Sequence, residues 1–362
     1  MTDTPQAAPF RAGMIAIVGR PNVGKSTLLN ALVGTHVSIT SNKPQTTRNR
    51  VMGVATRADA QFVFVDTPGL QHRHRNLLTR RMNAGVSAAI HGVDAIVMVI
   101  DAQQGWREED DAVLRLLPRP PAPGRAVTEA ATEAATEAAT ETATGSTPDI
   151  APEPLTETAP DAVPAAMPDA ASQPFTSRVV LVLSKTDLLR DRNALLPLIA
   201  GVAARYPFTA IVPVSASKSW QLDDLFDALR RLLPESLPLF DADEITDRSV
   251  RFLAAELIRE QAFRLLGDEL PYGLAVSIEA WEESAGRAVV SALIMVERDS
   301  QRGIVIGNGG SKLRAIGTKA RTAIERLLGK PVFLETHVRV SAGWNNSARS
   351  LDRLGVEAPQ RS

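Results

Sequence analysis

The octapeptide Gly19–Ser26, GRPNVGKS, constrains the fold more than any other stretch of this 362-residue chain. It follows the short apolar run Met14–Val18 and opens the amphipathic stretch Lys25–Val33. It matches the pattern G-x-x-x-x-G-K-[ST], in which glycines let backbone N–H groups face phosphate oxygens at a helix N-terminus. Lys25 then reaches the β- and γ-phosphates, and Ser26 coordinates Mg²⁺. The strand and helix on either side favour a nucleotide site over a glycine turn with a solvated lysine.

Strand-like and helix-like segments alternate along the first part of the chain. The short runs rich in β-branched residues are Met14–Val18, Gln61–Val65, Asp94–Ile100, Val179–Leu183 and Ala210–Val214. Between them lie the amphipathic stretches Lys25–Val33, Leu77–Ile90, Glu108–Leu117, Ala194–Ala203 and Leu222–Leu233. This alternation predicts an α/β domain with a mostly parallel, doubly wound sheet and a ligand at the carboxyl ends of its strands.

Residues 118–177 differ sharply in composition from the rest. They begin PRPPAPG, repeat TEAATEAATEAATE and contain few large apolar side chains, so burial cannot offset the entropy of ordering them. Nine carboxylates and no Lys or Arg fall between Thr128 and Ser172. With 40 basic and 41 acidic residues in all, removing those nine leaves eight excess positive charges. We predict a disordered acidic spacer in a surface loop, rather than a partner-binding segment, within an otherwise basic protein.

The composition also bounds the cellular setting. The chain has no cysteine, which excludes disulfides and thiolate metal sites and suits a reducing compartment. Its first residues, MTDTPQAAPFRAG, lack a basic start followed by an apolar core. The longest apolar runs, such as Ala95–Ile100, are far shorter than a membrane span. We therefore expect a cytosolic protein.

Two further segments have the chemistry of a magnesium nucleotide site. Asp66-Thr-Pro-Gly69 ends a strand, where an aspartate can hold Mg²⁺ through water and the Gly69 N–H can sense a γ-phosphate. The polar segment 38–50, SITSNKPQTTRNR, carries Thr46 and Thr47, and either hydroxyl could complete the Mg²⁺ shell. A segment ordered by γ-phosphate and Mg²⁺ is a switch. Without the phosphate loop, a plain turn and plain loop threonines would be the first interpretation.

The segment Ser184–Asp187, SKTD, follows another apolar run. In readers of guanine with the pattern Asn-Lys-x-Asp, the aspartate accepts hydrogen bonds from N1–H and the 2-amino group, which adenine lacks, and the lysine stem covers the base. Lys185 and Asp187 are both present. The asparagine mainly ties this loop to the phosphate loop, and a serine hydroxyl can make a shorter version of that link. We predict that guanine specificity is kept with weaker support, and that Ser215–Ser217 forms a second base-contacting loop.

The last part of the chain reads as a second, basic domain. Pro234–Glu244 resembles a linker; a helix is expected over Arg248–Leu266 and strands over Gly273–Trp281 and Ala288–Val296. From Arg302 to Arg349 nine basic residues face two acidic ones. That excess predicts a phosphate-binding face, although a solvated basic helix would show the same pattern.

Taken together, GRPNVGKS, QTTR, DTPG, SKTD and SAS, in this order, resemble the translation-factor-related GTPases of the TrmE–Era branch. The run VIGNGG, followed by SKLRAIGTKARTAIERLLGKPVFLETHVRV, resembles a type II KH domain, an α+β fold whose G-x-x-G turn clamps four nucleotides of single-stranded RNA. One KH domain and a tail reading SAGWNNSARSLDRLG are similar to the Era family. Ser184 and Asn308 depart from it, since Asn and Lys are usual there. Ile304, Ile306, Leu313 and Ile316 would supply the aliphatic groove of such a KH domain.

The resemblance implies a GTP-hydrolysing ribosome-assembly factor that binds 16S ribosomal RNA near its 3′ end and acts in maturation of the small subunit. It also implies Mg²⁺, a K⁺ ion held with the help of Asn22, a monomer, and peripheral contact with the cytoplasmic membrane. An alternative for Asn22 is to cap its own loop.

Leu70 stands where Ras-like switches carry a water-orienting glutamine. A competing interpretation is an RNA-binding clamp with little turnover; a tRNA-modification GTPase would need extra domains and a C-terminal cysteine.

The resemblance also assigns boundaries and residues. We expect a flexible N-terminus over 1–12, a GTPase domain over 13–235 interrupted by 118–177, a linker over 236–247, a KH domain over 248–343 and a tail over 344–362. Catalytic roles are assigned to Lys25, Thr47 and Asn22. Nucleotide contacts are assigned to Gly19, Arg20, Pro21, Asn22, Val23, Gly24, Lys25, Ser26, Thr27, Asp66, Thr67, Pro68, Gly69, Leu70, Ser184, Lys185, Thr186, Asp187, Ser215, Ala216 and Ser217. The first switch comprises Gln45, Thr46, Thr47, Arg48 and Asn49, and Mg²⁺ is assigned to Ser26, Thr47 and Asp66. RNA contacts are assigned to Ile306, Gly307, Asn308, Gly309, Gly310, Lys312, Arg314, Lys319 and Arg321.

Overall fold

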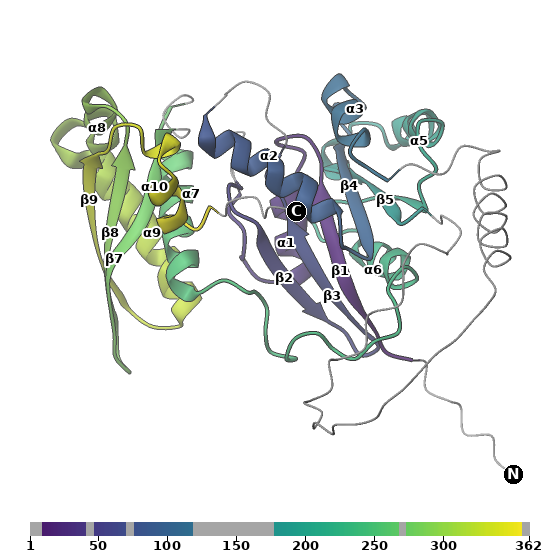
Figure 1. Cartoon of the computed structure of the whole chain (residues 1–362), viewed down its shortest axis with the longest axis horizontal. Coiled ribbons are helices and arrows are strands. Elements are labelled where there is room, and N and C mark those ends of the chain that lie inside the picture. The colour runs from purple at the N-terminus through teal and green to yellow at the C-terminus, as the bar shows by residue number, and fades with distance from the viewer. Residues whose placement is uncertain (1–8, 41–46, 70–75, 119–176, 268–272, 357–362) are drawn as a thin grey trace, which may run out of the picture. The chain divides into compact units, whose positions relative to one another are not determined.

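The structure is a computed structural model that describes residues 9–40, 47–69, 76–118, 177–267 and 273–356 (Figure 1). Contacts divide the chain into one unit of residues 1–117 and 178–362 and a second unit of residues 118–177. Only the first unit is described below. Gln45, Thr46, Leu70, residues 1–8 of the predicted flexible N-terminus and residues 119–176 of the predicted disordered insert lie outside the described ranges. Residues 9–12 of that N-terminus are described, and Arg11 and Ala12 are the first residues of a strand that pairs with residues 60 and 61.

The first domain is built on a six-stranded sheet with strand order β2-β3-β1-β4-β5-β6 (Figure 1). Its strands are β1 (Arg11–Val18), β2 (Val51–Thr56), β3 (Ala60–Asp66), β4 (Ala95–Asp101), β5 (Val179–Ser184) and β6 (Ala210–Pro213). All neighbours pair in parallel except β2, which runs antiparallel to β3. The predicted mostly parallel α/β sheet is confirmed.

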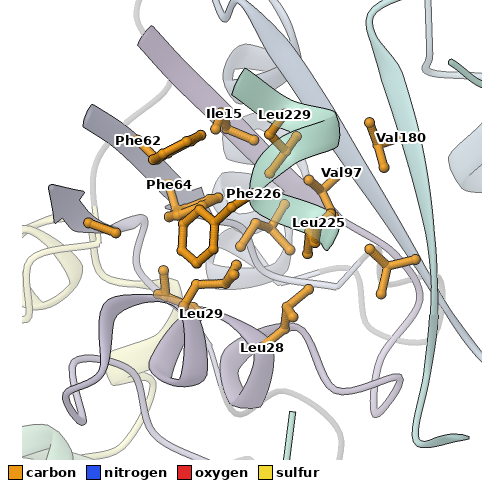
Figure 2. Packing of buried hydrophobic residues seen from close by; sticks show 14 of the residues in the cluster. Ile15, Leu28, Leu29, Phe62, Phe64, Val97, Val180, Leu225, Phe226 and Leu229 are labelled. Carbon is orange, nitrogen blue, oxygen red and sulfur yellow. The ribbon is translucent and has the colours of Figure 1, made fainter. Parts of the chain in front are cut away.

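Helices cover both faces of this sheet, because strands buried on two sides need an apolar layer against each. The helices are α1 (Lys25–Val33), α2 (Leu77–Ile90), α3 (Glu108–Leu114), α5 (Leu195–Ala203) and α6 (Leu222–Arg230). On one face, Leu28 and Leu29 of α1 and Phe226 of α6 pack with Phe62 and Phe64 of β3 (Figure 2). On the other face α2, α3 and α5 pack over the alternate strand residues.

The second domain has a three-stranded sheet of order β7-β8-β9, with β7 (Ala275–Glu283) antiparallel and β9 (Val332–Val340) parallel to β8 (Ala288–Val296). Three helices accompany it, α7 (Val250–Leu265), α8 (Asp299–Ile306) and α9 (Ser311–Leu328). Helices α7 and α9 share one buried core with Ala292 and Ile294 of β8. The element order α-β-β-α-α-β is the predicted α+β arrangement, and a short helix α10 (Ala348–Arg353) follows it.

Two details differ from the sequence-based expectations. Strand β2 was not among the expected strands; its VMGVAT sequence pairs along β3 on one side, and the Val54 N–H donates to the carbonyl oxygen of Ile245 on the other. Ile316, expected in an RNA groove, is fully buried in the core between α7, α9 and the sheet. The groove expectation was wrong for Ile316 because the apolar stripe of α9 faces inward at that position.

Candidate functional site

The predicted nucleotide-binding segments meet at one edge of the larger sheet. The phosphate loop follows β1, Asp66 ends β3, Asp101 ends β4 and Ser184 ends β5. These strands are parallel, so their carboxyl ends lie along the same edge. Segments that are far apart in the sequence are thereby brought together.

The phosphate loop has the backbone geometry that its glycines predict. Gly19 has a φ of 154°, and a Cβ there would lie 2.4 Å from the carbonyl oxygen of Val99. Gly24 has a φ of 102° and precedes the first turn of α1. The Lys25 ammonium donates to the carbonyl oxygens of Gly19 and Arg20 at 3.0 and 3.1 Å. Burial lowers the pKa of Lys25 to about 8, although the nearby Asp66 carboxylate opposes this shift.

Arg20, which was predicted to contact nucleotide, turns its side chain away from the loop. Its Nε donates to Asp110 Oδ2 at 3.2 Å and its Nη1 to Gln104 Oε1 at 3.1 Å. Asp110 belongs to α3 and is fully buried; burial raises its pKa, against the opposing charge of Arg20. The Arg20 side chain therefore anchors the phosphate loop to α3, which leaves its backbone to face a phosphate.

The three predicted Mg²⁺ ligands lie together. The hydroxyl oxygens of Ser26 and Thr47 are 2.8 Å apart, and they donate to Asp66 Oδ2 at 2.9 and 3.1 Å respectively. Ser38, which the sequence did not indicate, donates to the same oxygen at 3.0 Å. Burial raises the pKa of the Asp66 carboxyl, while the Lys25 charge and these hydroxyls lower it.

This oxygen cluster suits a hard divalent cation. The second carboxylate oxygen of Asp66, Oδ1, is buried and has no hydrogen-bond partner among the described residues. A buried carboxylate oxygen without a donor is stabilised by a cation, and hydroxyl and carboxylate oxygens are the protein ligands that Mg²⁺ accepts. Ser26, Thr47 and Asp66 therefore fit Mg²⁺ with retained waters.

Ser184 makes the short link predicted for it. Its hydroxyl lies 2.5 Å from the carbonyl oxygen of Val23 in the phosphate loop and 2.9 Å from that of Ile100, and can donate to either one. The side chain is 4% exposed. A serine thus ties the base-reading loop to the phosphate loop through the backbone of Val23.

Asp187 and Lys185 are positioned by their own partners. Ser215 and Ser217 donate to the two carboxylate oxygens of Asp187 at 2.6 and 3.1 Å. Burial raises the pKa of Asp187, but these hydrogen bonds outweigh burial and hold it below its ordinary value. The Lys185 ammonium donates to the carbonyl oxygen of Asn22 at 2.7 Å and to Asp101 Oδ2 at 2.8 Å. Asp101 was missed, although a carboxylate directly after an apolar strand is a recognisable signal.

The remaining predicted nucleotide contacts follow the loops that carry them. Asn22 is exposed and has a φ of 64°, a backbone conformation that asparagine tolerates better than most residues. The Thr67 hydroxyl donates to the carbonyl oxygen of Ile17 at 2.8 Å, which holds the start of the 67–69 turn against β1. A Cβ on Gly69 would lie 3.0 Å from Pro21 of the phosphate loop. The two turns are therefore in close contact.

Thr40, which precedes the predicted first switch, and Arg48, which belongs to it, both contact the second domain. Thr40 donates through its N–H and its hydroxyl to Glu260 Oε1 on α7, both at 2.9 Å. The Arg48 guanidinium donates to the carbonyl oxygen of Leu274 at 2.7 Å and lies 5.5 Å from the ring centroid of Trp344. Sequence reasoning missed Glu260, because a single acid within a helix carries no signal of such a contact.

The second domain carries a groove beside its glycine-rich turn. Gly307 directly follows α8 with a φ of 73°, and Gly310 precedes α9 with a φ of 78°. The groove, of about 340 Å³, is lined by Gly310, Leu313, Arg314, Gly317, Thr318, Arg321, Leu334 and Thr336. Arg314 and Arg321 thus lie where predicted. Lys319 instead lines another cavity, with Thr35 and His36. Ile306, Asn308 and Lys312 flank the turn and are at least partly exposed.

Comparisons with known proteins agree with both halves of the chain. A family model described as "50S ribosome-binding GTPase" matches residues 14–128, and a KH domain model matches residues 269–345. GTPase Era of Bordetella avium is 43% identical over 348 residues, which cover 96% of this chain and 98% of that protein. GTPase Era of Xanthomonas oryzae pv. oryzae is 42% identical over 351 residues, with coverage of 97% and 99%.

Two solved structures resemble the whole chain. Each has a TM-score of 0.77 and 33% identity, and covers 96% of this chain and 99% of its own. One is a point variant of Aquifex aeolicus Era bound to GDP·AlF4⁻. The other is Era in complex with MgGDPNP and nucleotides 1506–1542 of 16S ribosomal RNA. The similarity spans both sheets, including the α+β domain with the glycine-rich turn.

Proposed function

This chain belongs to the GTPase Era family, and from that premise we propose that it hydrolyses GTP and binds the 3′ region of 16S ribosomal RNA during maturation of the small subunit. The observation that carries the proposal is the meeting of Ser26, Thr47 and Asp66 in a chain whose second domain has a basic groove at a G-x-x-G turn. In this proposal residues 13–235 form the GTPase domain, 236–247 the linker, 248–343 the KH domain and 344–362 the tail.

In the nucleotide site, different residues bind the Mg²⁺ ion, the phosphates and the guanine base. Ser26, Thr47 and Asp66 hold Mg²⁺, which when bound neutralises charge on the β- and γ-phosphates. Lys25 is already among the loop carbonyls and exchanges them for phosphate oxygens, whose negative charge favours its protonated form. Asp187, held ionised by two serines, accepts the guanine N1–H and 2-amino hydrogens, and the Lys185 stem covers the base. Through Thr47, the first switch, 45–49, contacts the Mg²⁺ ion that accompanies the triphosphate.

We propose that a potassium ion supports turnover. Asn22 is exposed at the phosphate loop, where an amide oxygen can help to hold a monovalent cation. A cation there neutralises charge that develops between the β- and γ-oxygens, as an arginine finger does in other GTPases. Era-type family membership supports this role, and Asn22 completes the catalytic set with Lys25 and Thr47.

RNA binding is proposed for the groove beside the G-x-x-G turn. Backbone N–H groups of Gly307–Gly310 approach phosphates, Arg314 and Arg321 neutralise them, and Leu313 and Leu334 contact the bases. The Era complex with nucleotides 1506–1542 of 16S ribosomal RNA supports the choice of RNA for this chain. Asn308 supplies one positive charge fewer than the usual lysine.

A paired variant tests the RNA half of the proposal. Gly307→Asp with Gly310→Asp places carboxylates where phosphate must approach, so RNA binding should be lost while GTP binding stays. Gly267→Asp with Gly286→Asp adds the same charge at positions where a Cβ meets nothing within 4 Å. Persistence of RNA affinity in the first pair would remove the KH assignment.

Turnover separates the proposal from its alternative, an RNA-binding clamp that keeps its nucleotide. We expect phosphate release at saturating GTP to rise when small subunits are added. We also expect co-sedimentation with small subunits to differ between GTP and GDP. If the protein binds RNA with the same affinity in GTP and in GDP and releases no phosphate, the RNA-binding clamp is the correct interpretation.

Family membership also supports a monomer in the cytoplasm with peripheral contact to the cytoplasmic face of the cell membrane. None of the helices within the described ranges is long and apolar enough to cross a bilayer. Sedimentation velocity should give the mass of one chain. Flotation with anionic vesicles should recover part of the protein, and no recovery at low salt would remove the membrane contact.

A further inference from the structure

The smaller sheet has a second face that the KH groove does not use. Side chains alternate across a strand, so the residues of β8 that pack on α7 and α9, such as Ile294, are followed by residues that face away. Leu293 and Met295 are on that far face, and Met295 is in register with Arg339 of β9. The groove residues Leu334 and Thr336 have the opposite parity on β9. The far face is therefore separate from the groove.

A cavity of about 720 Å³ lies against this far face and also reaches Ala255, Val276 and Ile278 on the helix-packed side at the edge strand β7. Leu293 and Met295 line it from β8, Phe252 from the first turn of α7, and Ser350 and residues 352–355 from α10 and the turn after it. Helix α10 is fixed there, because Leu351 is fully buried with Met295 and Trp344, whose indole N–H donates to the carbonyl oxygen of Gly273 at 3.2 Å. The C-terminal segment thus forms a wall of the cavity.

The charges around this cavity favour an anion. Its lining includes Arg251, Arg339 and Arg353 against Glu279 and Asp352. Both acids have basic partners: Glu279 lies 3.5 Å from Arg339, and Asp352 lies 2.6 Å from Arg81. Within the described part of the chain, the side chains of Arg251 and Arg353 have neither an ion pair nor a hydrogen bond, and both residues are exposed. Two guanidinium groups are therefore available at the rim.

The cavity also offers what a nucleotide base needs. Phe252 and the thioether of Met295 provide apolar surface, on which bases pack without regard to sequence. The hydroxyls of Ser277, Ser341 and Ser350 line the same space and can donate to or accept from a base or ribose. An apolar floor with an arginine rim fits a nucleotide better than it fits an acidic peptide, which lacks the flat apolar part.

A strand of RNA can reach this cavity from the groove. Strand β9 is the edge of the described sheet, so no further described strand lies beyond it. Thr336 in the groove and Arg339 at the cavity are three residues apart, which corresponds to roughly 10 Å along a strand. A strand that leaves the groove therefore has a short path around the edge of β9.

We propose that the cavity on the far face of the KH sheet is a second RNA contact, which takes a nucleotide and its phosphates from the strand that leaves the G-x-x-G groove. Arg251 and Arg353 bind the phosphates, and Phe252 and Met295 contact the base. The inference rests on the proposed RNA-binding function, because the RNA strand reaches the cavity only if it is already bound in the G-x-x-G groove.

Two RNA probes and two paired variants test it. The probes are nucleotides 1506–1542 of 16S ribosomal RNA, the segment present in the Era complex, and a single-stranded hexanucleotide from their 3′ end, chosen to be short because a KH groove clamps four nucleotides. In Arg251→Gln with Arg353→Gln, affinity for the long RNA should fall roughly tenfold, and the slope of its salt dependence should fall by about 1.4. Affinity for the hexanucleotide and for GTP should not change. Arg231→Gln with Arg287→Gln removes two exposed arginines elsewhere and serves as the matched control.

Each result decides between explanations. Equal affinity of the two paired variants for the long RNA would overturn the second contact and leave the groove assignment intact. Equal loss for both RNAs would also overturn it, since the substitutions would then act on the groove. If the unsubstituted protein binds neither RNA, the proposed RNA-binding function itself fails, and the second contact fails with it.

Discussion

Ser184 occupies the position where related guanine-reading loops carry asparagine, and it contacts the phosphate loop by a short path. We predict that Ser184→Ala lowers the free energy of unfolding by about 1–3 kcal/mol, because the carbonyl oxygens of Val23 and Ile100 lose their shared donor. GDP affinity should fall, while preference for guanine over adenine stays. Urea unfolding and a fluorescent-GDP titration measure the two effects. Ser236→Ala is the control, since within the described ranges its hydroxyl donates only to the carbonyl oxygen of its neighbour Leu237.

Asp187 determines the base. Asparagine in its place keeps one acceptor but adds an N–H donor, which matches the extra carbonyl oxygen of xanthine. Asp187→Asn should therefore prefer xanthosine nucleotides, and the unsubstituted protein should bind GDP without competition from ATP. Displacement of labelled GDP by ATP at similar concentrations would mean that the serine at 184 has weakened base recognition.

Asn22 is the test of the potassium proposal. GTP turnover should be faster in potassium than in sodium at equal ionic strength, and Asn22→Ala should abolish the difference with little change in nucleotide affinity. Alanine is strained at a φ of 64°, so Asn22→Gly, which accepts that backbone without strain, should behave in the same way. Identical rates of the unsubstituted protein in the two salts would contradict the proposal.

At the scale of elements, helix α7 holds the segment before the first switch through one buried carboxylate. Burial raises the pKa of Glu260, but hydrogen bonds from His36 and Thr40 and the charge of Arg264 outweigh it and hold the pKa below its ordinary value. A carboxyl with a depressed pKa in the folded state contributes stability above its unfolded pKa, and this contribution is lost as the pH falls through the folded value.

Glu260→Gln should therefore lower the free energy of unfolding by about 1–3 kcal/mol at neutral pH. The difference from the unsubstituted protein should shrink as the pH falls below about 4.5, the ordinary value. Urea unfolding at a series of pH values measures it, with the exposed Glu282→Gln as control. A difference that does not depend on pH would show that the charge of Glu260 contributes nothing.

The elements that the sequence predicts well are those with strong periodicity and a clear end. The parallel strands of the first sheet read as continuous apolar runs, and the phosphate loop marks the boundary between β1 and α1. Strand β2 escaped detection because it is a short edge strand whose partners, β3 and the Ile245 carbonyl, are not apparent from its own sequence. Ile316 was misplaced for a related reason: helical spacing identifies a stripe but not which layer it faces.

At the scale of the molecule, the order of motifs predicts two domains and their classes, and it brings Ser26, Thr47 and Asp66 to one site. It does not predict the contacts between residues far apart in the chain. Thr40 with Glu260 and Arg81 with Asp352 join segments separated by more than 200 positions, and nothing in either segment identifies the other. The far-face cavity, which α10 completes, was hidden from the sequence in the same way.

The acidic insert provides a prediction about the whole chain. Leu117 and Val179, just outside it, are buried in one core that residues on both sides complete. Replacing residues 120–176 by a short Gly-Ser link should leave the melting temperature and GTP affinity nearly unchanged, because closure entropy varies slowly with loop length. RNA binding should stay or become tighter, since nine carboxylates leave. A large fall in melting temperature or weaker RNA binding would contradict the spacer interpretation.

The connection between α3 and β5 enters β5 at its amino end, whereas the nucleotide loops leave the parallel strands at their carboxyl ends. Sequence added at this connection is thus attached at the opposite edge from the chemistry. Insertions, deletions and substitutions in this connection therefore leave every nucleotide-binding loop unchanged. For that reason, selection for GTP hydrolysis should constrain the sequence of this segment only weakly. For the same reason it offers engineers a permissive point at which to graft a fluorescent reporter or an affinity tag.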